Sequence, residues 1–368
     1  MIIRDKLLFL LFISISVLLI TVPTLSPEQN QYESVTQAQK VSTTTEQTKE
    51  VVKVVQKTPV KKVVTPPVVV KTENPPQAIP VVQVESQVDF ESINQSSQKA
   101  IVNILCSTNS SVISPISGTG VIIDPRGIIL TNAHIGQFWL LKDYPTRNNV
   151  ECVIRTGSPA SISYYAELMY ISPRWIEENK TVLKDIEPKG TGENDFAFLR
   201  ITGMVNRSKL PESFAFVPPN IDDNIKENET VVLISYPAGF IGGTLILQNL
   251  FISSAITTIQ KIFTFKENTS DLISIGGTVV SQKGSSGGAV IDKKSTLIGI
   301  ITTETDGETT SDRSLFAITL AHINRSLNEE TDAGLANLLA RDPSSVSQTF
   351  RNTIQDTLTK LLTEALSK

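Results

Sequence analysis

The chain has 368 residues, which is enough for two or three domains, and its 40% hydrophobic and 19% charged residues are ordinary for a globular protein. A net charge of −4 gives no indication of nucleic-acid binding. With only two cysteines and two histidines, a disulfide-rich scaffold and a zinc site built from Cys and His are both excluded.

Residues 1–26 have the pattern of a targeting segment. Arg4 and Lys6 precede an almost wholly apolar run over 7–22, which is typical of an export signal. No Ala-x-Ala cleavage site follows, and the run approaches the ~20 residues of a bilayer crossing. Two alternatives remain, an uncleaved signal anchor, which we favour, and a cleaved signal peptide. In both, the basic end stays cytoplasmic and the rest is extracytoplasmic, membrane-anchored or secreted.

Residues 27–88 are rich in Thr, Val, Lys and Pro and contain almost no aromatic residues. Proline and lysine at this density disfavour a sheet interior. We predict a disordered linker between the N-terminal segment and a globular unit.

Residues 89–328 contain short apolar runs rich in β-branched residues, which Gly, Pro, Asn and Asp separate. This pattern predicts an all-β unit, either barrels or a sandwich. A helical period is visible only at 252–262. The runs are 101–106, 121–131, 150–154, 166–171, 196–201, 231–235, 245–254, 263–265, 276–280, 289–291, 297–303 and 315–320.

In residues 329–368 the apolar residues recur every three to four positions, which differs from the pattern of the preceding unit. Phe350, Ile354, Leu358, Leu361 and Ala365 would share one face of an amphipathic helix, and Leu362 and Leu366 would widen this face. Because the polar face mixes charge signs, we predict a C-terminal helical segment that docks on the globular unit, in preference to a membrane-surface or oligomerisation helix.

A serine flanked by glycines occurs late in the globular unit, in Gly284-Ser285-Ser286-Gly287-Gly288. Glycine permits unusual backbone angles, so the Ser286 hydroxyl can be exposed while the N–H groups of Gly284 and Ser286 converge as an oxyanion hole. Without a general base and a carboxylate elsewhere in the chain, such a loop is only weak evidence for a catalytic serine.

Candidates for both occur upstream. His134 follows the strand-turn-strand pattern that ends in Thr131-Asn132-Ala133, and Asp195 opens a strand of alternating apolar residues. The order His134, Asp195, Ser286 is that of chymotrypsin-type enzymes and differs from the orders in subtilisins and α/β-hydrolases.

These motifs, TNAH, NDFAFLRI and GSSGGAV, together with GIITTE at 299–304, resemble those of the trypsin-like (chymotrypsin-fold) serine peptidases. The resemblance is nearest to the bacterial high-temperature-requirement type, covers roughly 93–328, and includes no PDZ domain. It implies two antiparallel β-barrels, with His134 and Asp195 on the first, Ser286 on the second and the active site between them.

The resemblance also implies roles. Ser286 would attack a peptide carbonyl, His134 would transfer the proton, Asp195 would orient the imidazole, and the amides of Gly284 and Ser286 would bind the oxyanion. Polypeptides would be the substrates, and no metal or other cofactor is needed.

Two positions depart from the family pattern. Ser285 stands where many members have Asp or Asn before the nucleophile, so zymogen activation through an ion pair to a new N-terminus is not expected. Thr302 stands where a serine usually bonds the catalytic aspartate, and threonine keeps the hydroxyl.

The motif match also predicts a shallow apolar substrate pocket and cleavage after small apolar residues. Glu304 stands where deep-pocket members have glycine, and would narrow the mouth if it points inward. The alternative is that Glu304 faces solvent. The residues expected at the pocket and the substrate-binding edge are Val280, Thr302, Thr303, Glu304, Phe316 and Ala317.

Cys106 and Cys152 both fall in expected strands of the first barrel. They could form a disulfide in an exported domain or remain as two buried thiols, and their spacing does not decide between these alternatives.

We therefore expect an exported serine endopeptidase. The alternatives are a catalytically silent trypsin-like binding module and a structural protein of the envelope. The oligomeric state does not follow from the sequence.

Overall fold

The computed structural model describes residues 88–185, 190–239, 243–266, 268–304 and 314–368. The chain divides into two units, 1–80 and 81–368, and all described residues belong to the second. The predicted N-terminal targeting segment and all but the last residue of the predicted linker therefore lie outside the described residues. In the described part of the chain, no helix has both the length and the apolar character needed to cross a membrane.

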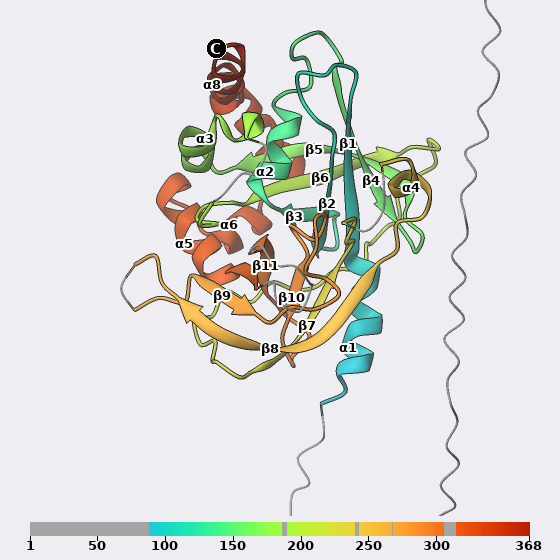
Figure 1. The fold of residues 1–368 in the computed structure, drawn as a ribbon. Helices are drawn as coiled ribbons and strands as arrows, with labels where there is room; N and C mark the ends of the chain where they lie inside the picture. The colour runs from blue at the N-terminus through green and yellow to red at the C-terminus, as the bar shows by residue number, and fades with distance from the viewer. Residues whose placement is uncertain (1–87, 186–189, 240–242, 267, 305–313) are drawn as a thin grey trace, which may run out of the picture. The chain divides into compact units, whose positions relative to one another are not determined.

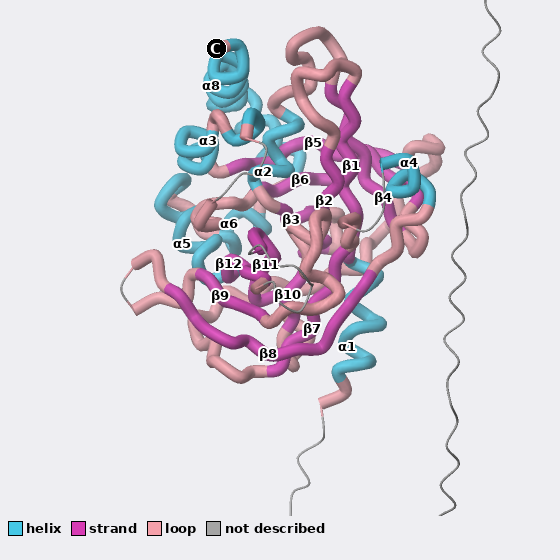
Figure 2. Tube along the Cα trace, viewed as in Figure 1, coloured by secondary structure: helices cyan, strands magenta, loops and turns pink. Residues whose placement is uncertain are grey.

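Two closed six-stranded barrels form the body of the second unit (Figures 1 and 2). The first has the order β1-β2-β3-β6-β5-β4 and the second the order β10-β11-β12-β9-β8-β7, with antiparallel neighbours throughout. The first barrel comprises β1 (Ile101–Thr108), β2 (Ile116–Asp124), β3 (Ile128–Thr131), β4 (Val150–Thr156), β5 (Ser161–Ile171) and β6 (Ala197–Met204). The second comprises β7 (Thr230–Ser235), β8 (Ser253–Phe263), β9 (Leu272–Ile275), β10 (Ala289–Ile291), β11 (Leu297–Glu304) and β12 (Leu315–Thr319). The predicted fold of two antiparallel barrels is confirmed.

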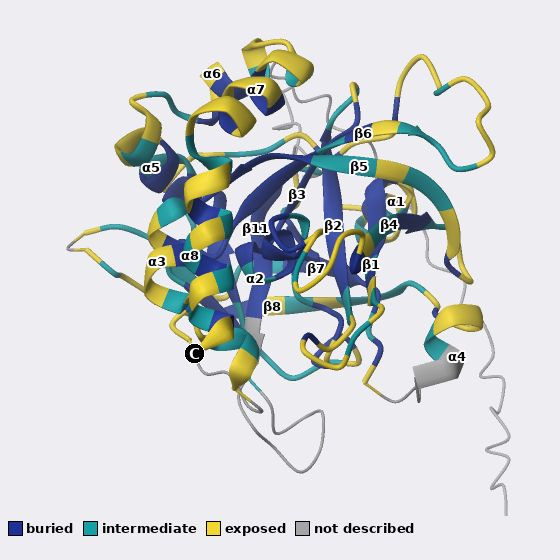
Figure 3. Cartoon of the chain, turned by 90° about the horizontal axis from the view of Figure 1, so that it is seen from above, coloured by how far each residue is buried: buried dark blue, intermediate teal, exposed yellow. Residues whose placement is uncertain are grey.

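Burial of their apolar side chains explains why these runs are strands. The aliphatic side chains of Val121, Ile129 and Leu199 are fully buried in the first barrel, and those of Leu233 and Ile273 are fully buried in the second. Figure 3 shows the strands as the buried centre of the molecule and the outer faces of the helices as exposed. The residues that separate the apolar runs occur in the turns between strands, for example Gly127, with φ of 83°, between β2 and β3.

The expected run 276–280 forms no strand and lies in the loop after β9. Two further sequence expectations about local structure were also wrong. The helical period at 252–262 belongs to β8, whose inner face is made by sparse buried residues such as Ile259. The run 245–254, expected as a strand, begins in the short helix α4 (Gly243–Gln248) and only then enters β8. Over 253–263 pairing with β7 and β9, and not local periodicity, determined the structure.

Helices border the barrels. Helix α1 (Phe90–Ser97) and the 3₁₀ turn η1 (Gln98–Ala100) precede β1, α2 (Ala133–Gly136) and η2 (Gln137–Trp139) follow β3, and α3 (Pro173–Asn179) and η3 (Val182–Lys184) follow β5. The C-terminal elements are α5 (Leu320–Thr331), α6 (Leu335–Ala340), α7 (Pro343–Phe350), the π-helical turn η4 (Arg351–Gln355) and α8 (Asp356–Ser367).

The C-terminal helices dock on the protein with their apolar faces. Leu358, Leu362 and Leu366 of α8 are buried, as the predicted amphipathic face requires. Ser347 Oγ of α7 donates to Leu168 O of β5, and Thr359 Oγ1 of α8 donates to Leu140 O beyond η2. The helices therefore cover the first barrel on the side of the segment that follows His134.

Candidate active site

His134 lies in the first turn of α2, directly after β3. Asn132 is extended, with φ of −78° and ψ of 155°, so the chain leaves the strand and turns into the helix at this point. Gly136 permits α2 to approach β6 closely, because a Cβ there would lie 2.5 Å from the Cβ of Ala197. The side chain of His134 keeps 25% of its surface exposed.

Asp195 lies in the turn before β6 and is buried. Its carboxylate faces His134 through two contacts: the His134 backbone N–H donates to Oδ1 at 2.9 Å, and Nδ1 lies 2.8 Å from Oδ2. Because an ionised carboxylate can only accept, Nδ1 carries the proton, and Nε2 is left with its lone pair. Asn132 Nδ2 also donates to Asp195 O at 3.0 Å.

The second barrel contributes a further hydrogen bond to the Asp195 carboxylate. Thr302 Oγ1, on β11, donates to Asp195 Oδ2 at 2.8 Å. This is the contact expected of the threonine that replaces the usual serine. Three donors thus fix the rotation of the Asp195 carboxylate, and one of them crosses between the barrels.

Ser286 lies in the loop before β10, and this loop depends on its glycines. Gly284 has φ of 95° and Gly287 has φ of 81°, both in the left-handed region. A Cβ on Gly287 would lie 2.0 Å from Thr119 O, and one on Gly284 would lie 2.8 Å from Tyr236 O. Any side chain at either position would therefore displace the loop.

The two candidate oxyanion amides, those of Gly284 and Ser286, are oriented by the carbonyls of their own peptide groups. Ala238 N donates to Lys283 O at 2.7 Å, and Gly288 N donates to Ser285 O at 2.8 Å. Because N–H and C=O point in opposite directions across a trans peptide, both amides are directed away from these partners. Within the described residues, neither amide has an acceptor.

The structure joins Ser286 to the His134–Asp195 pair indirectly. Ser286 Oγ donates to Thr302 O at 3.4 Å, and Thr302 Oγ1 in turn donates to Asp195. No hydrogen bond between Ser286 and His134 occurs among the described residues. The neighbouring Ser285 is buried, and its hydroxyl accepts from Ser235 Oγ at 2.9 Å, so an uncharged contact occupies the position of the usual acidic residue.

The expected substrate-binding residues lie around β11 and β12. Val280 and Ala317 are fully buried and belong to the core of the second barrel, together with Ile301 and Leu315. Phe316 is half-buried with its ring 5.9 Å from that of Phe263. Thr303 pairs with Phe316 and Glu304 with Leu315 in the backbone register of β11 and β12, but the side chains of Thr303 and Glu304 lie outside the described residues.

Cys106 of β1 and Cys152 of β4 form a disulfide, with Cα atoms 4.0 Å apart. They are direct cross-strand partners, so the bridge lies where β1 and β4 close the first barrel. Of the two alternatives from the sequence, the structure shows the bridge.

His322, the second histidine, lies in α5 away from the candidate site. Its Nδ1 is 3.2 Å from Asp271 Oδ1, and burial lowers the pKa of its imidazole. Burial alone would raise the pKa of Asp271, but hydrogen bonds from Thr269, Arg325 and the backbone outweigh this and hold the pKa well below its ordinary value. The cluster anchors the β8–β9 turn to α5.

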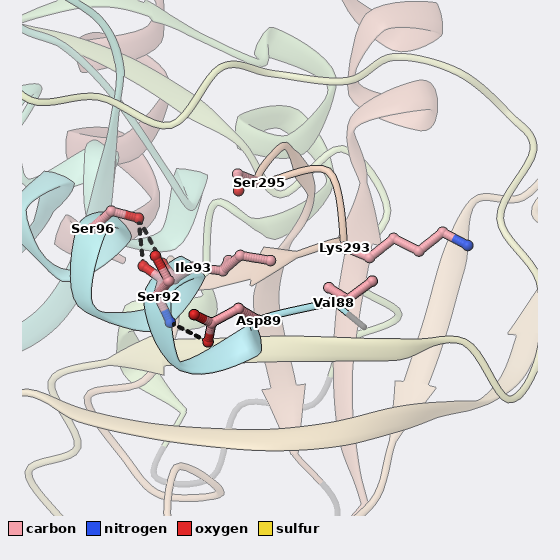
Figure 4. A pocket seen from close by; sticks show the side chains of 7 residues that line it. All are labelled: Val88, Asp89, Ser92, Ile93, Ser96, Lys293 and Ser295. Atoms are coloured by element: carbon pink, nitrogen blue, oxygen red, sulfur yellow. Dashed lines mark hydrogen bonds between the residues drawn. The ribbon is translucent and has the colours of Figure 1, made fainter. Parts of the chain in front are cut away.

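A recess of about 350 Å³ lies between the start of α1 and the β10–β11 turn (Figure 4). The polar groups on its helical side are paired with one another, because Asp89 accepts from Ser92 N and Ser92 O accepts from Ser96 Oγ. None of the candidate catalytic residues lines it.

Sequence reasoning missed the residues that hold the site from a distance. Thr119 of β2, Tyr236 and Ala238 contact the Ser286 loop, and Ser326 of α5 donates to Asn194 Oδ1 at 2.6 Å next to Asp195. Only Asn194 had a detectable signal, since its φ of 58° is one that asparagine adopts more readily than most residues.

Two closed six-stranded barrels, with a His–Asp pair on one and a glycine-rich serine loop on the other, define a trypsin-like fold. Residues 118–300 match the family model described as "Trypsin-like peptidase domain", and this part of the chain is a domain of that family. A solved structure described as "Crystal structure of Deg5" is similar at 15% identity, over 64% of this chain and 90% of that chain, with a TM-score of 0.42. The comparison with curated proteins found no match.

Proposed function

We propose that the protein is a serine endopeptidase in which Ser286 is the nucleophile, His134 the general base and acid, and Asp195 the residue that orients His134. The observation that carries the proposal is the continuous chain of hydrogen bonds from His134 through Asp195 and Thr302 to Ser286. A buried carboxylate, a partly exposed imidazole and a serine hydroxyl that lie along one connected path are typical of a catalytic site and support the proposal.

The chemistry follows from these positions. Ser286 Oγ attacks the peptide carbonyl carbon, and its proton passes to the free lone pair of His134 Nε2. The negative oxygen of the tetrahedral intermediate accepts from the amides of Gly284 and Ser286. His134 then gives the proton to the leaving amine, and a water molecule hydrolyses the acyl-enzyme by the same route.

Attack requires the Ser286 hydroxyl to leave its long contact with Thr302 O and to donate to His134. A change of the χ1 rotamer is the smallest motion that redirects the hydroxyl. We infer that bound substrate induces this change, because a peptide on the β11 edge would compete for the carbonyl groups of that strand.

One observation favours a second candidate, a catalytically silent trypsin-like binding module: Ser286 is bonded to Thr302 and not to His134. A fluorophosphonate probe separates the two functions. An active nucleophile should be labelled in the wild type and in a surface control such as Lys293→Ala, and labelling should vanish in Ser286→Ala and fall strongly in His134→Ala. Absence of labelling in a folded wild type would favour the silent module.

We further propose cleavage after small apolar residues. The burial of Val280, Leu315 and Ala317 supports a shallow pocket, since these side chains fill the interior of the second barrel. A size-selective apolar pocket discriminates by roughly 1–3 kcal/mol per methylene. A peptide-library digest should show Ala or Val before the cleaved bond, and Glu304→Gly should admit larger residues. Dominant cleavage after Arg or Lys would refute the pocket.

Export to an extracytoplasmic location, with a membrane-attached N-terminal segment, is also part of the proposal. Arg4 and Lys6 before the apolar run support it, and so does the Cys106–Cys152 disulfide, because such bridges persist mainly in oxidising compartments. Fractionation of the full chain should place it in the membrane with its peptidase domain accessible from outside the cytoplasm. Recovery of the full chain from the cytoplasm would contradict export, whereas a soluble secreted form would contradict only the anchor.

A further inference from the structure

Thr119 of β2 is a first-barrel residue that makes three hydrogen bonds to the second barrel and one to the neighbouring strand β3. Its side chain is fully buried. The hydroxyl donates to Gly284 O at 2.8 Å and accepts from Tyr236 N at 3.0 Å. Its backbone N–H donates to Ser286 O at 2.8 Å, and its carbonyl accepts from Thr131 Oγ1 at 2.7 Å.

These contacts complete the hydrogen bonding of the Ser286 loop. The carbonyls of Lys283 and Ser285 accept from Ala238 N and Gly288 N, which lie in the second barrel itself. The carbonyls of Gly284 and Ser286 both accept from Thr119. Each of the four carbonyls of 283–286 therefore has a donor, and Thr119 supplies two of the four, while the amides of Ser285 and Gly287 donate to Gln282 O and Ile301 O.

The Thr119 hydroxyl also joins two segments that the oxyanion hole needs together. Tyr236 N donates to it, and two residues further on Ala238 N holds the peptide group that carries the Gly284 amide. One hydroxyl therefore sets the distance between the segment after β7 and the Ser286 loop. Burial leaves no water to replace it, so its loss would leave Gly284 O and Tyr236 N without a partner.

We propose that the Thr119 hydroxyl is a positioning residue for the two oxyanion donors, by which the first barrel sets the geometry of the Ser286 loop on the second. This inference rests on the proposed peptidase function. Its consequence is that removal of the hydroxyl impairs stabilisation of the tetrahedral intermediate more than it impairs substrate binding.

The test compares Thr119→Val, which keeps the shape and loses the hydroxyl, with Thr119→Ser, which keeps the hydroxyl. Thr319→Val is the matched control. The Thr319 hydroxyl is equally buried, donates to Ser270 O at 2.6 Å and accepts from His322 N at 3.0 Å, but lies away from the loop.

We expect Thr119→Val to lower kcat on a peptide substrate by about 10- to 100-fold with KM little changed, since loss of one oxyanion donor itself costs about 10²–10³-fold. Its affinity for a peptide boronate, which mimics the tetrahedral adduct, should fall in parallel. Thr119→Ser should restore both. Thr319→Val should lower thermal stability while kcat stays within about twofold of the wild type.

Wild-type kcat in Thr119→Val would overturn the inference, and so would an equal loss of kcat in Thr119→Val and Thr319→Val. A wild type that neither cleaves peptides nor reacts with fluorophosphonate would instead contradict the proposed function. In that case amide hydrogen exchange still decides the positioning role: exchange in the 283–288 loop should rise in Thr119→Val and not in Thr119→Ser, and unchanged exchange refutes it.

Discussion

Replacement of Arg155 by methionine tests how a buried cation holds the segment next to the Ser286 loop. Arg155 is among the largest fully buried side chains. Its guanidinium donates to Ala160 O at 2.7 Å, to Leu247 O at 3.0 Å and to Ile246 O at 3.1 Å. Among the described residues no carboxylate pairs with it, and burial lowers the pKa of its guanidinium.

The magnitude follows from these contacts. Methionine fills a similar volume but removes the donor to three backbone carbonyls, at about 1–2 kcal/mol each for partly buried groups, and the longer contact to Asn103 Oδ1 at 3.3 Å. Removal of the cation recovers part of its own desolvation cost, which opposes this loss. We therefore expect Arg155→Met to lower the free energy of unfolding by about 2–3 kcal/mol, and the Arg155→Lys control, which keeps the charge without the planar array of donors, to lie between methionine and wild type.

Urea unfolding is the assay, with the midpoint read at an unchanged slope. Because Arg155 anchors the end of α4, and Tyr236 and Ala238 precede this helix, peptidase activity should also decline in Arg155→Met. If the methionine variant is as stable as the wild type, the hydrogen bonds of the guanidinium stabilise the fold by no more than the cost of burying its charge. That result would refute the reasoning.

Three further results are expected. Thr302→Val should lower kcat about tenfold and Thr302→Ser should not, because only the first removes a donor to Asp195 Oδ2; equal kinetics would contradict this. Simultaneous Cys106→Ala and Cys152→Ala should lower the unfolding free energy by about 2–4 kcal/mol, as the chain-entropy estimate for their separation implies, and an unchanged urea midpoint would argue against it. The pKa of Asp271 is lowered in the fold, so its contribution to stability is present above the unfolded pKa of 3.8 and lost as the pH falls below it. Asp271→Asn should therefore flatten the decline of stability below about pH 4, and a decline as steep as in the wild type would exclude this assignment.

The fold could be predicted largely because its signals are local. Strand runs such as 121–131 and 196–201 are rich in β-branched and other apolar residues that the barrel buries almost continuously, and the turn at Gly127 is encoded by one residue. The amphipathic face of α8 could also be predicted, from the spacing of its apolar residues. Periodicity failed at β8, where Ile256 is exposed and only pairing with β7 and β9 specifies a strand.

The candidate site was predictable residue by residue but not in its connections. His134, Asp195 and Ser286 each stand in a short motif, so the sequence identifies them. The contacts that join them are long-range. Thr119 lies 165 residues from Gly284, and no periodicity or motif relates two such positions. That Ser286 would be bonded to Thr302 and not to His134 depends on side-chain geometry between two barrels, which local patterns do not contain.

Two threonines cross the boundary between the barrels in opposite directions. Thr302 extends from the second barrel to the Asp195 carboxylate on the first, and Thr119 extends from the first barrel to the carbonyl of Gly284 on the second. A relative shift of the barrels by a fraction of an ångström would lengthen both bonds together. The orientation of His134 and the geometry of the oxyanion amides are therefore not independent, and a substitution at either threonine should alter the effect of a substitution at the other, since both act on the same barrel interface.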